Sequence, residues 1–290
     1  MMVGQHVEFR PEETDKIMTD PIYADFHVHT NYSPCGHKEA TLGAMIARAR
    51  EKGMAALGFA DHVTPETVPG CGFYDGQQPD VLRRQAAELD LLPLPDDLEI
   101  LKGVEADYTL AGVGCLTTEV LGLVDHVICA ASHFHLPAAP RPSEDTPRSR
   151  AELMVRMVRE MLAVQGVTVW AHPFDCSAMR PLAPIMDEID IATQAELIEM
   201  ANAREIAVEI NGGPGQDFAY REATVAFFGL AREMGARFTV TADAHHPDDF
   251  ERLDLALDWA RQMGIRDRDL LTASEIRQRF ARQRPLSAGR

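Results

Sequence analysis

The sequence predicts an α/β protein in which parallel strands form a closed or nearly closed barrel. Two observations support this fold class. Amphipathic helical stretches end in glycine, at Gly53, Gly166 and Gly235, and a short apolar run follows each of these glycines at once. Glycine in the left-handed conformation ends a helix, and a short apolar run bounded in this way is typical of a buried strand. Repeated alternation of helix and strand favours a parallel sheet.

The first half of the chain contains the first four expected strands. Each is a short apolar run, and they cover residues 23–28, 55–60, 99–105 and 126–131. Helical periodicity lies between them at 39–52, which ends at Gly53, and at 79–91. The segment 110–123 has no clear pattern. The Pro-rich and polar segment 63–79 is expected to be a long loop.

The second half continues the same alternation with three more strands. They cover residues 167–171, 206–210 and 238–242. Helices are expected at 148–165, 193–204, 218–234, 249–263 and 273–283, and a second long loop at 136–149. Two capping boxes, Thr193 with Glu196 and Thr272 with Glu275, support two of the helix starts.

Composition limits the class of protein. Apolar residues make up 46% of the 290 residues and charged residues 25%, as in ordinary globular proteins. The formal net charge of −17 argues against binding of long duplex nucleic acid. No run of about 18 apolar residues exists, so no membrane span is expected.

Cysteine usage and the N-terminus indicate the compartment and the domain plan. The five cysteines include no CxxC pair, which favours reduced thiols and a cytoplasmic location. Residues 1–22 contain acidic side chains and no apolar run, so we expect an N-terminal arm and no secretory signal. Residues 23–290 are expected to form a single domain.

Polar side chains gather where the expected strands end. Each of the seven strands delivers a His, Asp, Glu or Asn at its carboxyl end; the set includes His27, His29, His62, Glu105, Asp107, His133, His172, Glu209, Asn211, Asp243 and His245. In a parallel barrel the loops that follow the strands form the active site at that end. The sequence therefore predicts a functional site at the carboxyl ends of the strands.

The residue types in this set point to metal binding. His27 and His29 lie on the same face of a strand, because side chains alternate with period two. Imidazoles with one or two carboxylates suit zinc, manganese or iron. The remaining candidates have simpler interpretations. Cys35 and Cys176 are expected to be small apolar fillers, and His126, at the start of its strand, is expected to pack in the core.

Several segments together resemble the PHP family, named for polymerase and histidinol phosphatase. The matching segments are DFHVHTNYSPCGH (25–37), KGMAALGFADH (52–62), LKGVEADY (101–108), VICAASHFH (127–135), VWAHPF (169–174), AVEINGG (207–213) and TADAHHP (241–247). They span nearly the whole chain, about residues 23–265. The CGH sequence resembles the histidinol-phosphatase branch most, although the spacer between HVH and CGH is slightly longer here. The resemblance implies a distorted (β/α)7 barrel, similar to a TIM barrel.

The resemblance also implies three divalent ions, which are zinc, manganese or iron, held by nine ligands. By similarity, the first ion is held by His27, His29, Glu105 and Asp243. The second is held by Glu105, His133 and His172, with His135 as the alternative to His133. The third is held by His37, His62 and His245.

The implied chemistry is hydrolysis of a phosphate ester. Two ions bridged by Glu105 would lower the pKa of a shared water, and the third would bind phosphoryl oxygens. The predicted catalytic residues are Glu105, Asp243 and His246. Predicted substrate-binding residues are Arg180, Arg221 and His135; Arg141, Arg148 and Arg150 are further candidates for binding phosphate. The leaving-group acid stays open among Asp107, His135 and His246.

These features leave three functions in order of preference. The first is a phosphomonoesterase acting on a small phosphorylated substrate, with histidinol phosphate as an example. The second is a phosphodiesterase or nuclease-like enzyme on nucleotides or short oligonucleotides. The third is a non-catalytic metal-binding module. An amidohydrolase barrel also uses an HxH motif, but no bridging lysine is evident at the fourth strand. The oligomeric state is not predicted.

Overall fold

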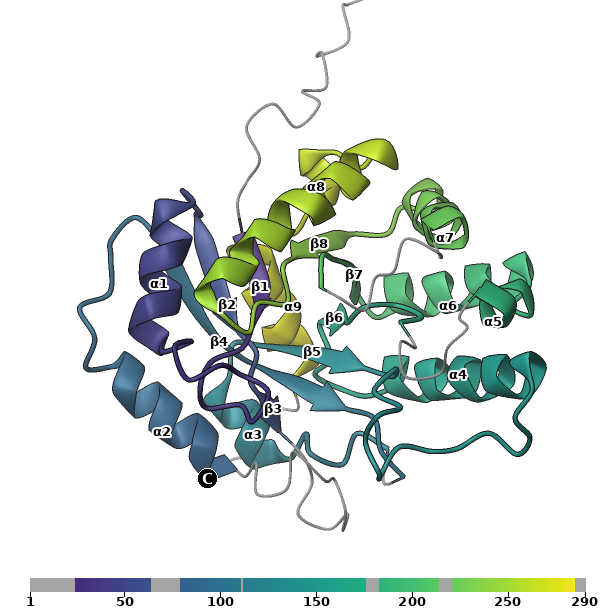
Figure 1. Cartoon of the computed structure of the whole chain (residues 1–290), viewed down its shortest axis with the longest axis horizontal. Coiled ribbons are helices and arrows are strands. Elements are labelled where there is room, and N and C mark those ends of the chain that lie inside the picture. Colours follow the sequence, from purple (N-terminus) through teal and green to yellow (C-terminus); the bar gives the residue numbers. More distant parts are fainter. Residues whose placement is uncertain (1–23, 64–78, 111, 176–182, 214–220, 285–290) are drawn as a thin grey trace, which may run out of the picture.

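The computed structural model describes residues 24–63, 79–110, 112–175, 183–213 and 221–284. Within them, parallel strands form a nearly closed barrel that helices surround (Figure 1). The strands lie in the order β1 (Ala24–Val28), β2 (Ala56–Phe59), β4 (Glu99–Asp107), β5 (His126–Ala130), β6 (Val169–Trp170), β7 (Ala207–Asn211) and β8 (Phe238–Thr241). The predicted seven-stranded parallel barrel is confirmed. A further short strand, β3 (His62–Val63), pairs with β4.

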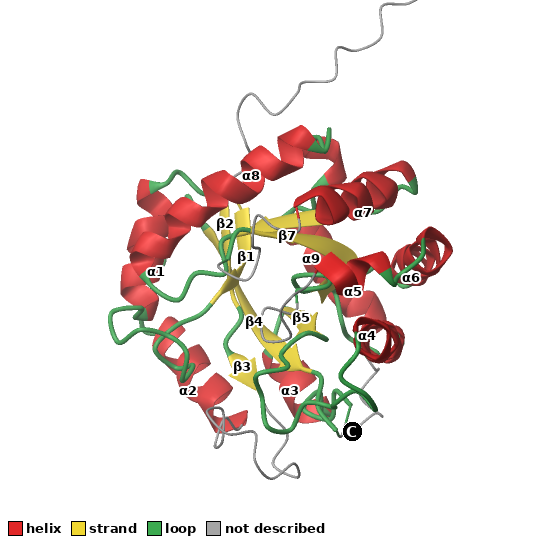
Figure 2. Cartoon of the chain, turned by 45° about the vertical axis from the view of Figure 1, so that its right-hand side comes forward, coloured by secondary structure: helices red, strands yellow, loops and turns green. Residues whose placement is uncertain are grey.

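Helices pack around this barrel (Figure 2). They are α1 (Leu42–Glu51), α2 (Pro79–Leu89), α3 (Thr118–Leu123), α4 (Pro147–Leu162), α5 (Ala183–Asp187), α6 (Ile191–Ala203), α7 (Arg221–Glu233), α8 (Arg252–Gln262) and α9 (Ala273–Gln283), with 3-10 turns η4 (Pro247–Glu251) and η5 (Asp267–Asp269). The predicted helices are confirmed to within a few residues. The short helices α3 and α5 were not predicted, because fewer than two turns show little periodicity.

The helix ends follow the predicted signals with one exception. Gly53, Gly166 and Gly235 all have positive φ, between +70° and +94°, as left-handed caps require. The Thr272–Glu275 capping box is present at the start of α9.

The predicted Thr193–Glu196 box is wrong. Helix α6 begins at Ile191, and the carboxylate of Asp190 accepts the hydrogen bond from Thr193 N. Glu196 pairs instead with Arg159 at 2.7 Å.

The seam between β1 and β8 closes through few backbone bonds and one side chain. His29 N donates to Ala244 O at 2.8 Å. The buried carboxylate of Asp25 accepts hydrogen bonds from His27 N in its own strand and from Ala242 N across the seam, both at 2.9 Å. This carboxylate therefore joins the first and last strands directly below the predicted ligands.

The amino end of the barrel is filled by apolar side chains and one histidine. Leu271, Ala273 and Ile276, at the start of α9, join a buried cluster with residues from the barrel strands, so α9 closes this end. The ring of His126 lies against Gly103, where an added Cβ would approach it to 2.0 Å. Its Nε2 atom lies 3.0 Å from Phe26 O. The prediction that His126 is a core residue is confirmed.

Some predictions fall outside the described residues or stay untested. The expected arm at 1–22 and most of the expected loop at 63–79 lie outside them. Among the described residues, no helix is long and apolar enough to cross a membrane. The cytoplasmic location and the single-domain assignment stay predictions.

Candidate metal centre

The carboxyl ends of the strands bring most of the predicted ligands into one buried cluster. Strand β1 contributes His27 and His29, both 1% exposed or less, and their Nε2 atoms lie 3.1 Å apart. Alternation along the strand places both rings on the barrel side. The other members come from the ends of β4, β5, β6 and β8 and from β3.

Glu105, near the end of β4, lies at the centre of this cluster. Its Oε2 atom is 3.2 Å from His27 Nε2, 3.3 Å from His29 Nε2 and 3.3 Å from His62 Nε2. Its Oε1 atom is 3.0 Å from His172 Nε2 and 3.6 Å from His133 Nε2. The two oxygens of one carboxylate therefore face two different sets of imidazoles.

Asp243 closes the side of the cluster nearest β1. Its Oδ1 atom lies 3.4 Å from His27 Nε2 and 3.3 Å from His29 Nε2, and 3.6 Å from His245 Nδ1. This oxygen is buried and has no hydrogen-bond partner among the described residues. An unsatisfied buried carboxylate oxygen beside two imidazole nitrogens fits a cation ligand.

The electrostatics of the cluster favour charged carboxylates. Burial alone would raise the pKa of the Glu105 carboxyl, but the surrounding imidazoles, His62 and His27 first, hold it well below its ordinary value. Burial opposes ionisation of Asp243 in the same way, and His27 and His245 lower the pKa of its carboxyl well below the usual range. Both carboxylates are therefore negatively charged near neutral pH and available to a cation.

Buried groups behind the rings fix their orientation. Glu209 Oε1, on β7, lies 2.7 Å from His27 Nδ1 and accepts from Thr241 Oγ1 at 2.8 Å. Ser132 Oγ lies 2.8 Å from His172 Nδ1. These contacts engage Nδ1 and leave Nε2 facing the centre, the arrangement that metal-binding histidines commonly use.

Asp107 plays the same part for two other rings. Its Oδ2 atom lies 3.2 Å from His62 Nδ1, and its Oδ1 atom contacts His133 Nδ1. Asp107 is fully buried behind these imidazoles. This position suits the orientation of ligands and does not suit proton donation to a leaving group.

The backbone is strained at two predicted ligands. His172 and Asp243 have φ angles of +25° and +51°, in a region that residues other than glycine rarely adopt. Such a conformation costs about 1–3 kcal/mol per residue and is found most often at functional sites. The surrounding bonds hold it in place; His172 N, for example, donates to Glu209 Oε2 at 2.6 Å.

The donor set fits divalent cations. Among the described residues, five groups of side chains have donor atoms within 4.8 Å of one another, and three of them join ligands of the first two predicted sites: His27 with His29 and Asp243, His27 with Glu105 and His172, and His62 with Glu105 and His133. Imidazole and carboxylate donors suit zinc, manganese and iron. These groups contain all the residues of the first two predicted ion sites.

The third predicted set is only partly assembled. The rings of His62 and His245 both stack on that of His29, with centroids 4.8 and 4.2 Å from its centroid. His37 is exposed and groups with Glu39 and His246 instead. Cys35 occupies the inner position: its sulfur lies within 4.8 Å of donor atoms of His29 and His62.

The other candidates lie at the margin of the cluster or away from it. The ring of His135 is 5.1 Å from that of His133. His246 caps η4 by accepting from Asp248 N, and its Nε2 atom lies 3.1 Å from Glu39 Oε2. Arg180 and Cys176 lie outside the described residues, as does the side chain of Arg221 at the start of α7.

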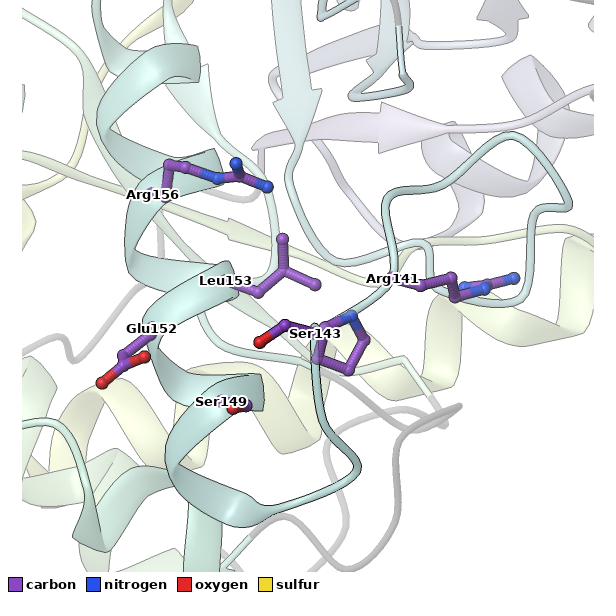
Figure 3. Close-up of a pocket in the computed structure, with 7 residues that line it drawn as sticks. Arg141, Ser143, Ser149, Glu152, Leu153 and Arg156 are labelled. Atoms are coloured by element: carbon purple, nitrogen blue, oxygen red, sulfur yellow. The ribbon is translucent and has the colours of Figure 1, made fainter.

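The arginines after β5 are engaged elsewhere. Arg141 donates to Phe134 O at 2.6 Å and to Leu136 O at 3.0 Å, which secures the segment after His133. Arg148 pairs with Glu152 at 3.0 Å, and Arg150 pairs with Asp145. Arg141 also lines a cavity of about 340 Å³ against α4, with Ser143, Leu153 and Arg156 among the other lining residues (Figure 3). None of the clustered ligands lines this cavity.

The sequence reasoning missed three groups of this site. It expected Cys35 to be an apolar filler; Cys35 does pack against Leu136 and Ala139, but its sulfur also lies within 4.8 Å of donor atoms of His29 and His62. It listed Asp107 only as an acid candidate. It noted Glu209 at a strand end without a role. The available signal was alternation along the strands: Asp107 lies two residues after the ligand Glu105, and Glu209 lies near the carboxyl end of its own strand, two residues before Asn211.

Comparisons with known proteins agree with the fold and the motifs. A family model described as PHP domain matches residues 25–211. A protein named probable phosphatase from Vibrio parahaemolyticus is 26% identical over 273 residues, covering 88% of this chain and 91% of that protein. One of the same description from Vibrio vulnificus is 26% identical over 259 residues, covering 86% of this chain and 88% of its own length.

Two solved structures share the fold. One is the histidinol phosphate phosphatase of Lactococcus lactis complexed with zinc, L-histidinol and phosphate; it has a TM-score of 0.63 and 14% identity, covering 84% of this chain and 94% of that one. The other, a histidinol phosphatase homologue from Listeria monocytogenes, has a TM-score of 0.58 and 13% identity, covering 79% and 97%.

Proposed function

Because the chain belongs to the PHP domain family and is a hydrolase acting on phosphate ester bonds, we propose that it hydrolyses a small phosphomonoester. The observation that carries the proposal is the position of Glu105, whose two oxygens face imidazoles on opposite sides. L-histidinol phosphate is the first substrate to test, because the L. lactis enzyme of the same fold was solved with zinc, L-histidinol and phosphate.

The proposal assigns two ion sites to the buried cluster. His27, His29 and Asp243 hold one with Glu105, and His133 and His172 hold the next with the same Glu105. Divalent ions bound here would supply a water of lowered pKa and positive charge for the phosphoryl oxygens. A third ion is supported by the rings of His62 and His245, which both stack on that of His29 with centroids 4.8 and 4.2 Å from it.

The residues behind the imidazoles hold the rings in one orientation before an ion binds. Glu209 and Asp107 hold the Nδ1 atoms of His27 and His133, so the Nε2 atoms of these rings need no reorientation on binding. Asp107 Oδ2 also lies 3.2 Å from His62 Nδ1. Preorganised donors contribute most to rate when they need not move during the reaction.

His135 is the described residue best placed to contact substrate beside the cluster. Burial lowers the pKa of its imidazole to about 4, so the ring is neutral near pH 7. A neutral ring suits a hydrogen bond to substrate better than protonation of a leaving group. Asp107 and His246 are both held by other groups, as described above.

The test is hydrolysis by metal-loaded protein. Protein loaded with zinc or with manganese is assayed against a panel of phosphomonoesters, including L-histidinol phosphate, and of nucleotide diesters. We expect monoester hydrolysis that a chelator abolishes, and between two and three ions per chain by elemental analysis. Glu105→Gln should lower both ion content and rate, since the bridging charge is lost. Glu99→Gln, at the exposed start of the same strand, is the matched control.

Other outcomes would redirect the assignment. Cleavage of diesters without monoesterase activity would favour the nuclease-like alternative. Full ion content with no hydrolysis of either class would favour a non-catalytic metal-binding module.

A further inference from the structure

His37 lies apart from the other residues of the third ion set. Its side chain is exposed, and its ring centroid is 4.9 Å from that of His246, at the rim of the site. Its backbone is tied to the centre, because His37 N donates to His245 O at 2.8 Å. The ring itself is engaged at the rim, where its Nδ1 atom accepts a hydrogen bond from Glu39 N at 3.3 Å.

Cys35, two residues earlier, points the other way. Its sulfur and one ring nitrogen each of His29 and His62 lie within 4.8 Å of one another. It also makes a side-chain contact with His245. The Cys35 side chain therefore lies close to those of His29, His62 and His245.

A tight turn after β1 explains this orientation. Ser33 N donates to Thr30 O and Gly36 N donates to Ser33 O, both at 3.0 Å. Thr30 is anchored by its hydroxyl, which donates to Asp61 at 2.6 Å. A Cβ at position 36 would lie 1.8 Å from Thr30 O, so only glycine permits the turn. The chain reverses within these residues and carries Cys35 inward.

From this arrangement we infer that Cys35, in place of His37, is the thiolate ligand of the third ion together with His62 and His245. The inference rests on the proposed function, since it concerns one ion of the same centre. A sulfur ligand makes this position softer than the two oxygen- and nitrogen-lined positions. It should select zinc or iron over manganese.

Thiolates, not thiols, bind metal ions, so Cys35 would release its proton when the ion binds.

X-ray absorption at the zinc edge of the zinc-loaded full chain tests the inference directly. A sulfur shell at about 2.3 Å is expected in the wild type, with roughly one third of a sulfur per zinc when three ions are bound. Cys35→Ser should abolish that shell and remove one zinc per chain. His37→Ala should keep both. Cys176→Ser and Cys71→Ser are matched controls for other sources of sulfur and should keep the shell.

A rescue variant separates ligand loss from misfolding. Cys35→His should restore the zinc content without restoring the sulfur shell, because imidazole can replace thiolate as a zinc ligand. A sulfur shell that persists in Cys35→Ser, or a zinc lost in His37→Ala and kept in Cys35→Ser, overturns the inference.

The absorption spectrum tests the assignment of Cys35, and the activity assay tests the proposed function, so each can be overturned without the other. Wild-type protein that binds zinc without sulfur and hydrolyses a monoester overturns only the assignment of Cys35. Protein that shows the sulfur shell and hydrolyses nothing overturns only the proposed function. Protein that binds neither zinc nor manganese overturns both.

Discussion

At the scale of single residues, the ligands are held by partners that contribute no ligand atom. Glu209 is the clearest case, because its carboxylate contacts the ring of His27 and the backbone of His172 at once. Burial alone would raise the pKa of the Glu209 carboxyl, but the His27 imidazole outweighs this effect, and the pKa lies below its ordinary value. Glu209 therefore stays charged and keeps Nδ1 of His27 as a hydrogen-bond donor.

Glu209→Gln should weaken metal binding without unfolding the protein. The amide is nearly isosteric but carries no charge, and loss of such a partner typically lowers metal affinity by about 10–100-fold. Competition with a chromophoric chelator measures the affinity. Glu205→Gln, just before the same strand, is the control and should leave affinity unchanged, because this carboxylate pairs with Arg282 away from the cluster. An unchanged affinity in Glu209→Gln would show that His27 needs no such orientation.

The core histidine predicts a pH dependence of stability. Burial lowers the pKa of His126 from 6.5 to about 4. The unfolded chain therefore binds a proton more readily than the folded one below pH 6.5. The stability that His126 contributes is fully present above pH 6.5 and is lost as the pH falls toward 4.

His126→Gln should reduce that pH dependence, since glutamine can still donate to Phe26 O and does not titrate. Urea unfolding at pH 7 and pH 5 measures the free energy of unfolding for the two proteins. The loss between these pH values should be smaller in the variant than in the wild type. His37→Gln, exposed, should retain the wild-type loss. Equal losses in the wild type and His126→Gln would rule out His126 as the source.

The residue types of the site were predictable, but the direction of each side chain was not. His27 and His29 follow from strand alternation, and they lie together as expected. Cys35 and His37 lie in a turn, where no period applies. Their directions depend on Gly36 pressing against Thr30 O and on the bond from His37 N to His245 O. Such contacts join distant parts of the chain and leave no local pattern.

At the scale of elements, helix and strand order was predictable and some boundaries were not. Strand β6 spans only Val169–Trp170, although the apolar run extends over 167–171. The side chain of Thr168 bonds to the backbone of Val127, at both N and O, next to the regular ladder. Apolar composition shows that a segment is buried but does not show where regular pairing stops.

Two residues near the start of α6 could each cap this helix, and substitutions can tell them apart. Asp190 and Thr193 are both capping residue types three positions apart, and the structure uses Asp190, whose Oδ1 accepts from Thr193 N at 2.7 Å. Asp190→Ala should lower the free energy of unfolding by about 1 kcal/mol. Thr193→Ala should lower it by less, as measured by chemical denaturation. A larger loss in Thr193→Ala would restore the cap that the sequence pattern predicted.

At the scale of the whole molecule, the centre connects strands that are distant in sequence. His27 and His29 end β1, Glu105 lies near the end of β4, and Asp243 follows β8. The seam between β1 and β8 has few backbone bonds. A cation shared by these residues would therefore link both strands of this seam to the middle of the barrel.

Bound ions should therefore stabilise the folded barrel. Ions that bind the folded chain and not the unfolded one stabilise it, by about 2.7 kcal/mol for each site at 100 times its dissociation constant. Chelation should therefore lower the Tm of the wild type by several degrees, since about 1 kcal/mol shifts the Tm of a domain of 150–250 residues by about 2–4 °C. Differential scanning calorimetry with and without a chelator measures the shift.

Two matched variants show whether the chelator-induced shift in Tm comes from ions at the metal centre or from ions bound elsewhere. Glu105→Gln should show a smaller chelator-induced shift, because its two sets of imidazoles no longer share a charged carboxylate. Glu99→Gln lies at the other end of β4, where Glu99 pairs with Arg277, and should keep the full shift even if its own Tm is lower. A wild-type Tm that chelation leaves unchanged would mean that the barrel closes without help from the ions. The short seam, with the Asp25 carboxylate across it, would then be sufficient to close the barrel.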